Sequence, residues 1–157
     1  MGLRRREVAI RIALQRVSRA AVRVGGRTVA EIGRGLLLLV GIGREDGLGT
    51  YDRVAEKVLN LRIFPDETGR MNRSLVEVGG EVLVVPQFTL YADVRRGRRP
   101  SFERAAPPEV AADRVEAFCR ALEARGASVR RGAFREHMEV ELVNDGPVTI
   151  WIDTDRM

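Results

Sequence analysis

The stretch Gly35-Leu36-Leu37-Leu38-Leu39-Val40-Gly41 holds the longest uninterrupted apolar run in this chain of 157 residues. It has no polar side, so it predicts a central β-strand that is covered on both faces. The run is far shorter than the roughly 20 apolar residues that a membrane-spanning helix needs. With 45% hydrophobic and 31% charged residues, the chain has the composition of one soluble globular domain.

Alternation of apolar and polar residues predicts strands on the N-terminal side of this central strand. The segment from Val8 to Val17 alternates with a period of two, which is typical of a half-buried strand. Two shorter β-prone runs, 21–24 and 28–32, flank Gly25-Gly26. Because glycine readily adopts positive φ angles, this pair predicts a tight hairpin turn.

Two amphipathic helices are expected on the C-terminal side. Thr50 is a suitable N-cap for a helix whose apolar residues recur at three-to-four spacing as far as Leu61. A second helix is expected to open at Pro108 and to end at Gly126. Cys119 lies on the apolar face of this helix, so we expect a buried thiol rather than a nucleophile.

Three further apolar runs predict the remaining strands. Residues 81–91 form a strongly apolar segment, and residues 138–143 and 148–153 alternate at the end of the chain. The sequence contains no internal repeat and no low-complexity linker, which favours a single domain. The first nine residues, with Arg4-Arg5-Arg6, are interpreted as a basic N-terminal extension of a domain over 10–157.

Arginine dominates the positive charge. The formal net charge is +5, and Lys57 is the only lysine among the 27 basic residues. Because guanidinium groups bind phosphate bidentately and stack on bases, this bias fits an RNA partner. A GC-rich or heat-adapted genome that favours arginine codons would explain it equally well. The loop Arg95-Arg96-Gly97-Arg98-Arg99 is the candidate phosphate contact, through Arg96, Arg98 and Arg99.

Counting residues excludes several enzyme classes. One cysteine and one histidine, Cys119 and His137, cannot form an internal disulfide or a zinc site without carboxylates supplying most of the ligands. The chain has no phosphate-binding loop, no Gly-x-Ser-x-Gly motif and no dinucleotide fingerprint. We therefore expect a cytoplasmic protein without a metal or an organic cofactor and without a membrane partner.

Two short segments have a composition that a purely structural role does not explain well. Gln87 and Thr89 follow Pro86 in the apolar run and bring hydrogen-bonding groups that a core strand avoids. Asn144-Asp145-Gly146-Pro147-Val148-Thr149 separates the last two runs. By residue type alone, this second segment is most simply an ordinary hairpin turn.

Together these segments resemble the D-aminoacyl-tRNA deacylase family, whose members hydrolyse the ester between a D-amino acid and tRNA. The similar stretches are Leu14-Gln15-Arg16-Val17-Ser18-Arg19-Ala20, Gln87-Phe88-Thr89-Leu90-Tyr91-Ala92 and Asn144-Asp145-Gly146-Pro147-Val148-Thr149. The resemblance extends from about Ile10 to Asp153. It implies one compact α/β domain with a mostly antiparallel, barrel-like sheet and two main helices.

The resemblance also implies a homodimer with its active site at the subunit interface. Gly146-Pro147 would be a cis pair that projects into the partner's pocket, held by Arg16, with Asn144 and Thr149 also binding substrate. A rigid backbone surface beside the α-carbon leaves no room for an L side chain, so L-aminoacyl-tRNA is rejected while D-amino acids and glycine enter.

The resemblance places the chemistry at Gln87, Phe88 and Thr89. The backbone N–H groups of Phe88 and Thr89 are expected to stabilise the developing oxyanion. Thr89 either attacks the ester itself, although no base is evident in the sequence, or shapes a site in which the ribose 2′-hydroxyl assists. Pro86 stands where the family usually has serine, which removes a hydroxyl and a backbone donor.

Two other functions are consistent with the sequence. One is a noncatalytic RNA-binding protein of the same fold, which has lost turnover through changes such as Pro86. The other is an esterase or amidase that acts on small D-amino-acid derivatives.

Overall fold

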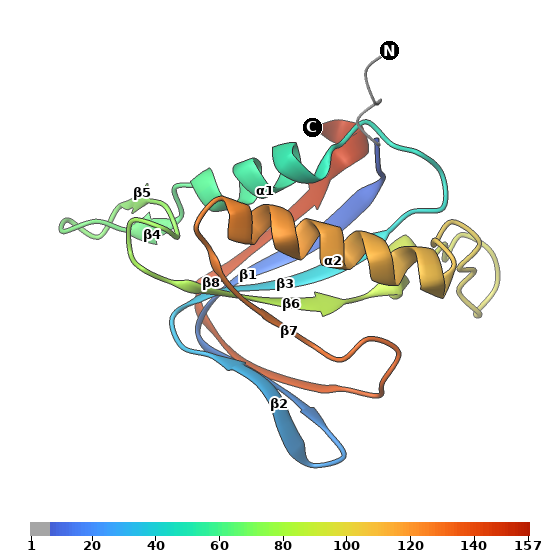
Figure 1. The fold of residues 1–157 in the computed structure, drawn as a ribbon, viewed down its shortest axis with the longest axis horizontal. Helices are drawn as coiled ribbons and strands as arrows, with labels where there is room; N and C mark the ends of the chain where they lie inside the picture. The colour runs from blue at the N-terminus through green and yellow to red at the C-terminus, as the bar shows by residue number, and fades with distance from the viewer. Residues whose placement is uncertain (1–6) are drawn as a thin grey trace.

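The longest strands of the sheet lie side by side (Figure 1). A computed structural model of the chain describes residues 7–157. β1 (Ile10–Val24) pairs antiparallel with β8 (Glu139–Asp153) along one edge. Along its other edge it pairs antiparallel first with β3 (Gly35–Ile42) and then with β2 (Arg27–Ile32). A strand that changes partner in this way lets the sheet curve into a nearly closed barrel.

Parallel pairing completes the sheet. β3 pairs with β6 (Glu81–Pro86), and β6 pairs with β7 (Ser128–Arg131), both in parallel. Parallel neighbours need long crossover connections, and these contain α1 (Tyr51–Asn60) and α2 (Pro108–Ala124). Both helices lie on the same side of the sheet (Figure 1). The short elements are β4 (Phe64–Pro65) and β5 (Met71–Arg73), which form a projecting hairpin, and the 3-10 turns η1 (Phe88–Tyr91) and η2 (Thr154–Arg156).

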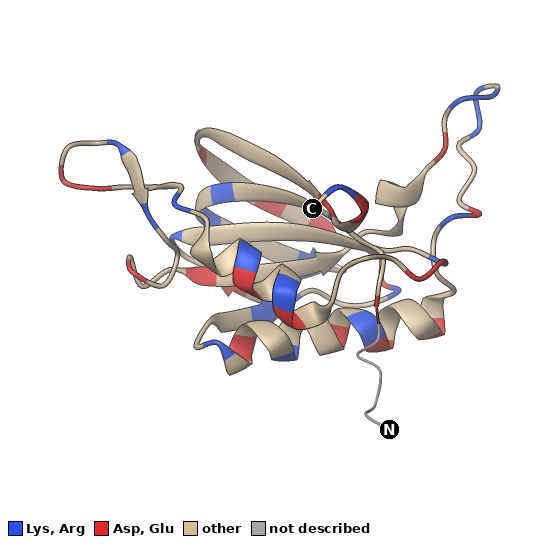
Figure 2. Cartoon of the chain, turned by 90° about the horizontal axis from the view of Figure 1, so that it is seen from above, with Lys and Arg blue, Asp and Glu red and all other residues tan. Residues whose placement is uncertain are grey.

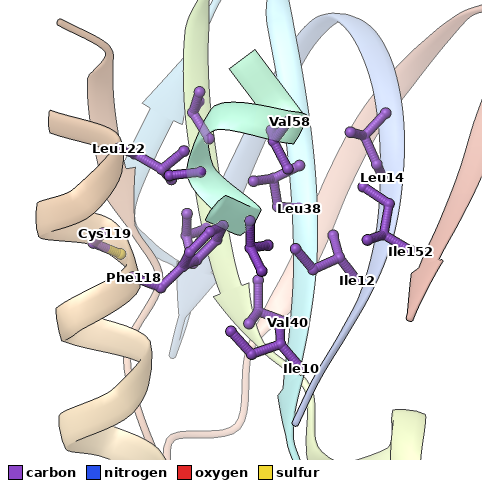
Figure 3. Packing of buried hydrophobic residues seen from close by; sticks show 14 of the residues in the cluster. Ile10, Ile12, Leu14, Leu38, Val40, Val58, Phe118, Cys119, Leu122 and Ile152 are labelled. Carbon is purple, nitrogen blue, oxygen red and sulfur yellow. The ribbon is translucent and has the colours of Figure 1, made fainter. Parts of the chain in front are cut away.

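The core has a part on each face of the central strand. Leu38 packs with Phe118 between the sheet and the helices (Figure 3), and Leu36 belongs to the same cluster. Leu37 packs on the opposite face with Leu83, inside the curved part of the sheet. The prediction that this strand is covered on both faces is therefore confirmed.

The predicted caps and turns are confirmed as well. Thr50 Oγ1 accepts a 3.2 Å hydrogen bond from the Arg53 backbone N–H at the start of α1. Gly25 and Gly26 have φ angles of 57° and 81° in the two-residue hairpin between β1 and β2. Gly126 follows α2 with a φ of 92°. Cys119 is fully buried, and burial raises the pKa of its thiol to about 12.

Three expectations about strands are wrong in detail. The runs 8–17 and 21–24 are parts of one strand, β1, because register shifts near Val17 interrupt the alternation without ending the ladder. The runs 138–143 and 148–153 belong to one strand, β8, so the segment between them is a bulge and not a hairpin turn. The run 81–91 is a strand only as far as Pro86 and then turns into η1.

The single α/β domain with a mostly antiparallel, barrel-like sheet and two main helices is confirmed. β4, β5 and β7 were not predicted from the sequence. The basic residues Arg4-Arg5-Arg6 lie outside the described residues, so the extension over 1–9 stays a prediction, while Val8 and Ala9 are buried. Within residues 7–157, no helix is both long and apolar enough to cross a membrane.

Candidate active site

The first cluster of predicted site residues lies on the tight turn that follows β6. The Gln87 N–H donates to the Val40 carbonyl oxygen at 2.8 Å and so ends the strand. The Ala92 N–H then donates to the Thr89 carbonyl oxygen at 3.0 Å, which closes η1. The Gln87 side-chain amide donates to Thr89 Oγ1. The turn thus brings Gln87 and Thr89 together and leaves Phe88 and Thr89 exposed.

The Thr89 hydroxyl has one side-chain hydrogen-bond partner among the described residues, the Gln87 amide. Its hydrogen bond from the Gln87 amide nitrogen occupies an acceptor position, and an amide nitrogen cannot take up a proton. No carboxylate, histidine or lysine of residues 7–157 forms a hydrogen bond with this hydroxyl. The geometry therefore favours a shaping role for Thr89 over nucleophilic attack.

A cavity of about 700 Å³ opens beside this turn, between α2 and the sheet. Pro86, Gln87 and Phe88 form one wall. Phe88 and Phe102 meet edge to face, with ring centroids 5.0 Å apart and planes at 72°. The opposite wall is formed by the segment between β7 and β8, including Phe134, Arg135, Glu136, His137 and Met138.

The cavity is mainly apolar and has the size of a small-molecule site. No sequence pattern had predicted a site role for Phe102, Phe134, His137 or Met138. Nothing in the pattern of residues 132–138 identifies them, since they reach the cavity only through the pairing of β7 and β8 with distant strands.

The second cluster surrounds the bulge in β8. Gly146 has a φ of 150°, and the Gly146-Pro147 peptide bond is cis. Arg16 is only 9% exposed. Its Nε donates to the Asp145 carbonyl oxygen at 2.8 Å, and its Nη1 donates to the Ile63 carbonyl oxygen at 2.6 Å. The guanidinium therefore fixes the backbone on one side of the bulge.

Asn144 and Thr149 fix the other side of the bulge. Asn144 Oδ1 accepts from the Val148 N–H at 2.7 Å, and Asn144 Nδ2 donates to Thr149 Oγ1 at 3.2 Å. Gln15 Nε2, on the neighbouring strand, also donates to Thr149 Oγ1 at 3.3 Å. These side chains shape the backbone around Gly146 and Pro147 from within the same chain.

The two clusters do not meet within the chain. The turn cluster contacts β1 at Arg11, whose Nη1 donates to the Leu90 carbonyl oxygen, and the bulge cluster contacts β1 at Arg16. Five positions along a strand correspond to about 16 Å. Among residues 7–157, no hydrogen bond or ion pair joins Gln87, Phe88 or Thr89 to the bulge.

The arginine loop projects from the body of the molecule (Figure 2). Reciprocal 2.8 Å backbone hydrogen bonds between Asp93 and Ser101 close its base. Arg95 is bound to the Asp93 carboxylate, and its hydrogen bonds lower the pKa of Asp93 to about 2. The other three guanidinium groups are exposed and form no ion pair among the described residues; they belong to Arg96, Arg98 and Arg99.

The fold and the two clusters define the class: a single α/β domain with a nearly closed mixed β-barrel and two helices. The family model described as "D-Tyr-tRNA(Tyr) deacylase" matches residues 13–153. The chain belongs to this family.

Relatives cover almost the whole chain. A protein of Thermomicrobium roseum named "D-aminoacyl-tRNA deacylase" is 58% identical over 148 residues, which are 94% of this chain and 96% of the relative. A protein of the same name from Symbiobacterium thermophilum is 57% identical over 147 residues, 94% of this chain and 97% of the relative.

Solved structures share the fold. One, a "c-Myc DNA Unwinding Element Binding Protein", has a TM-score of 0.84 and 39% identity, with 90% of this chain and 97% of that chain covered. A probable eukaryotic D-amino acid tRNA deacylase has a TM-score of 0.74 at 21% identity, with 92% and 99% covered, and it supports the fold alone.

Proposed function

We propose that this protein hydrolyses the ester bond of D-aminoacyl-tRNA and releases the free D-amino acid and tRNA. The observation that carries the proposal is the near full-length identity of 58% to a D-aminoacyl-tRNA deacylase. The chain keeps Gln87, Phe88 and Thr89 on one turn, and Gly146 and Pro147 on the exposed bulge of β8. The substrate is made during translation, so we place the activity in the cytoplasm.

The turn cluster supplies the groups for ester hydrolysis. Phe88 and Thr89 are the first residues of η1, so their N–H groups have no acceptor within that turn. Two such donors stabilise a developing oxyanion by on the order of 3 kcal/mol each. An aminoacyl ester next to a ribose 2′-hydroxyl is already labile, and so positioning accounts for most of the required acceleration.

The cavity is suited to the terminal nucleoside of the substrate. Its volume of about 700 Å³ accommodates a nucleoside with an attached aminoacyl group. The Phe88, Phe102 and Phe134 side chains line it, and aromatic rings bind bases by stacking. If the base of the terminal nucleoside is held there, the ester on its ribose would lie beside the Gln87–Thr89 turn.

A homodimer supplies the missing part of the site. The bulge lies about 16 Å along β1 from the turn in the same chain, so a second copy has to bring its own Gly146-Pro147 to the cavity. β8 is bonded on one side only among the described strands. Trp151 and Val143 on this strand are 52% and 42% exposed, which supports β8 as part of the contact surface.

In this dimer the Gly146-Pro147 backbone is the element that rejects L-aminoacyl-tRNA. A fixed backbone surface excludes the side chain of an L-amino acid. It does not contact the side chain of a D-amino acid and so does not select among D side chains by size. The expected specificity is therefore broad among D-amino acids and includes glycine. The exposed Arg96, Arg98 and Arg99 bind the tRNA backbone.

A noncatalytic nucleic-acid-binding protein is the second candidate. The solved relative that is 39% identical is named for binding a DNA element. Pro86 also removes a backbone donor next to the Gln87–Thr89 turn. Against this candidate, the chain has both the Gln87–Thr89 turn and the Gly146-Pro147 bulge that the chemistry needs.

Parallel assays of D-tyrosyl-tRNA and L-tyrosyl-tRNA, with release of labelled tyrosine as the readout and a chelator present, test the proposal. We expect rapid hydrolysis of the D ester and survival of the L ester. If both esters survive while tRNA is bound, the second candidate replaces the first. Hydrolysis of both esters would contradict the role of Gly146-Pro147, and equal turnover of a free D-tyrosine ester would indicate a small-ester hydrolase.

A further inference from the structure

The Arg11 side chain contacts the Phe88–Tyr91 turn from β1. Its Nη1 donates to the Leu90 carbonyl oxygen at 3.0 Å. Its guanidinium carbon lies 4.4 Å from the centroid of the Tyr91 ring. Its Nε lies 3.4 Å from Asp153 Oδ2, and the Arg11 side chain is only 17% exposed. Three contacts therefore fix one guanidinium beside the turn.

The Tyr91 ring also packs against the backbone of β3 and of the residue that follows it. Tyr91 is 3% exposed. A Cβ atom at Gly43 would lie 2.9 Å from Tyr91 Cζ, and one at Gly41 would lie 3.3 Å from Tyr91 Cδ2. Glycine at these two positions leaves room for the ring. Tyr91 is thus held by close backbone contacts as well as by the Arg11 guanidinium.

Arg11 binds both of the residues that follow Thr89 in the turn, through the Leu90 carbonyl and the Tyr91 ring. A guanidinium over an aromatic face and a charge-assisted hydrogen bond are each stronger when partly buried, as here. Arg11 itself is held by Asp153 at the end of β8. The turn is thereby fastened to both β1 and β8.

We propose that Arg11 is a positioning residue for ester hydrolysis: it holds the Phe88–Tyr91 turn, and with it the Phe88 and Thr89 N–H groups, in place beside the cavity. Arg11 does not line the cavity and acts only through Leu90 and Tyr91. The inference rests on the proposed deacylase function and names a determinant of its rate. It predicts an effect on turnover rather than on binding of tRNA.

The test compares Arg11→Met and Arg11→Lys with the wild-type protein on D-tyrosyl-tRNA. Methionine keeps much of the length and removes the charge, so kcat should fall by about tenfold to a hundredfold, because small misplacements of reacting groups cost rates of this order. KM should stay within about twofold, since no substrate contact is lost. Lysine keeps the cation near Tyr91 and Asp153 and should recover most of the loss.

Arg131→Met is the matched control. Arg131 is also partly buried and is bound to two carboxylates, those of Glu116 and Glu123, at 2.8 Å and 2.7 Å. None of these three residues lines the cavity. The control should lose stability to a similar degree while its kcat, corrected for the folded fraction, stays unchanged.

A second readout does not require deacylase activity. Hydrogen exchange of the Ala92 amide, which donates to Thr89, should accelerate by about tenfold in Arg11→Met and not in Arg131→Met. A wild-type protein that does not hydrolyse D-tyrosyl-tRNA would refute the proposed function, whereas the exchange result would still test the role of Arg11. The inference is overturned if Arg11→Met keeps kcat within twofold of wild type, if the control loses as much, or if exchange at Ala92 is unchanged.

Discussion

The Nε atom of Arg16 donates a 2.8 Å hydrogen bond to the carbonyl oxygen of Asp145, the residue before Gly146. The same guanidinium reaches the Ile63 carbonyl oxygen at 2.6 Å. One nearly buried side chain on β1 therefore connects the bulge of β8 with the segment that leads from α1 into the β4–β5 hairpin. The position of Gly146-Pro147 depends on Arg16, which lies 129 positions before the Asp145 that it binds.

Replacing Arg16 with lysine tests this connection. A lysine ammonium cannot reach both carbonyl groups with the same planar geometry. One of them would be left buried without its charged donor, so we expect the free energy of unfolding to fall by about 2 kcal/mol. Urea denaturation measures this loss. The preference for D- over L-tyrosyl-tRNA should fall as well, and an unchanged preference would contradict the role given to Arg16.

Gly146→Ala tests the bulge itself. Gly146 has a φ of 150°, and an added Cβ would lie 2.8 Å from both the N and Cγ2 atoms of Val148. We expect a loss of about 1–3 kcal/mol in the free energy of unfolding and a lower ratio of D to L hydrolysis. Gly69→Ala is the control, because Gly69 has a φ of 84° and nothing within 4 Å of the added atom. That variant should lose stability by backbone strain alone and keep the ratio; an equal loss in both would exclude a specific role for Gly146.

Thr89→Ala distinguishes the two roles of the hydroxyl. Because the only side-chain partner of Thr89 Oγ1 among the described residues is the Gln87 amide, we expect at least about a tenth of the wild-type kcat to remain. Single-turnover hydrolysis of D-tyrosyl-tRNA measures it. A loss of about 10⁴-fold or more would instead identify Thr89 as the nucleophile.

The arginine loop should govern the salt dependence of tRNA binding. Replacing Arg96, Arg98 and Arg99 with serine removes three exposed cations that have no acidic partner among the described residues. The log of the association constant falls as the log of the salt concentration rises, and the magnitude of this slope should decrease by about three. Titrations of deacylated tRNA at several salt concentrations measure the slope. A matched triple variant takes exposed arginines from other surfaces: Arg27, Arg53 and Arg70. An equal change in that variant would mean that binding is spread over the whole surface.

Asp66 should titrate well below the ordinary range of an aspartate. Its carboxylate accepts hydrogen bonds from the Thr68 side chain and from the Thr68 and Arg70 N–H groups, which lower its pKa to about 2. A pKa that is lower in the folded than in the unfolded state stabilises the fold above about pH 4, and the contribution is lost as the pH falls through about 2. The amide chemical shifts of Thr68 and Arg70, measured as a function of pH, should show a midpoint near pH 2. A midpoint near pH 4 would contradict this hydrogen-bond network.

Much of the fold could be predicted from the sequence because it depends on the local periodicity of apolar residues. The apolar run Leu36–Val40, the Gly25-Gly26 hairpin and the Thr50 cap are each decided by a few consecutive residues, and the structure confirms all three. β7 was missed because a four-residue strand of Ser, Val and two arginines has no distinctive pattern. It forms only because the completed edge of β6 offers hydrogen bonds to it.

The candidate site, too, could be predicted only in part from local sequence. The residue types could be read without the structure: the polar Gln87 and Thr89 after an apolar strand, the Gly146-Pro147 pair and the arginines of the loop. That the 144–149 segment is a bulge in a continuous strand follows from long-range pairing, since both of its flanks pair with β1 in the same direction. The cavity walls and the separation of the two clusters likewise depend on the curvature of the whole sheet. Contacts between residues far apart in the chain follow from how the strands pair, and no local pattern encodes that pairing.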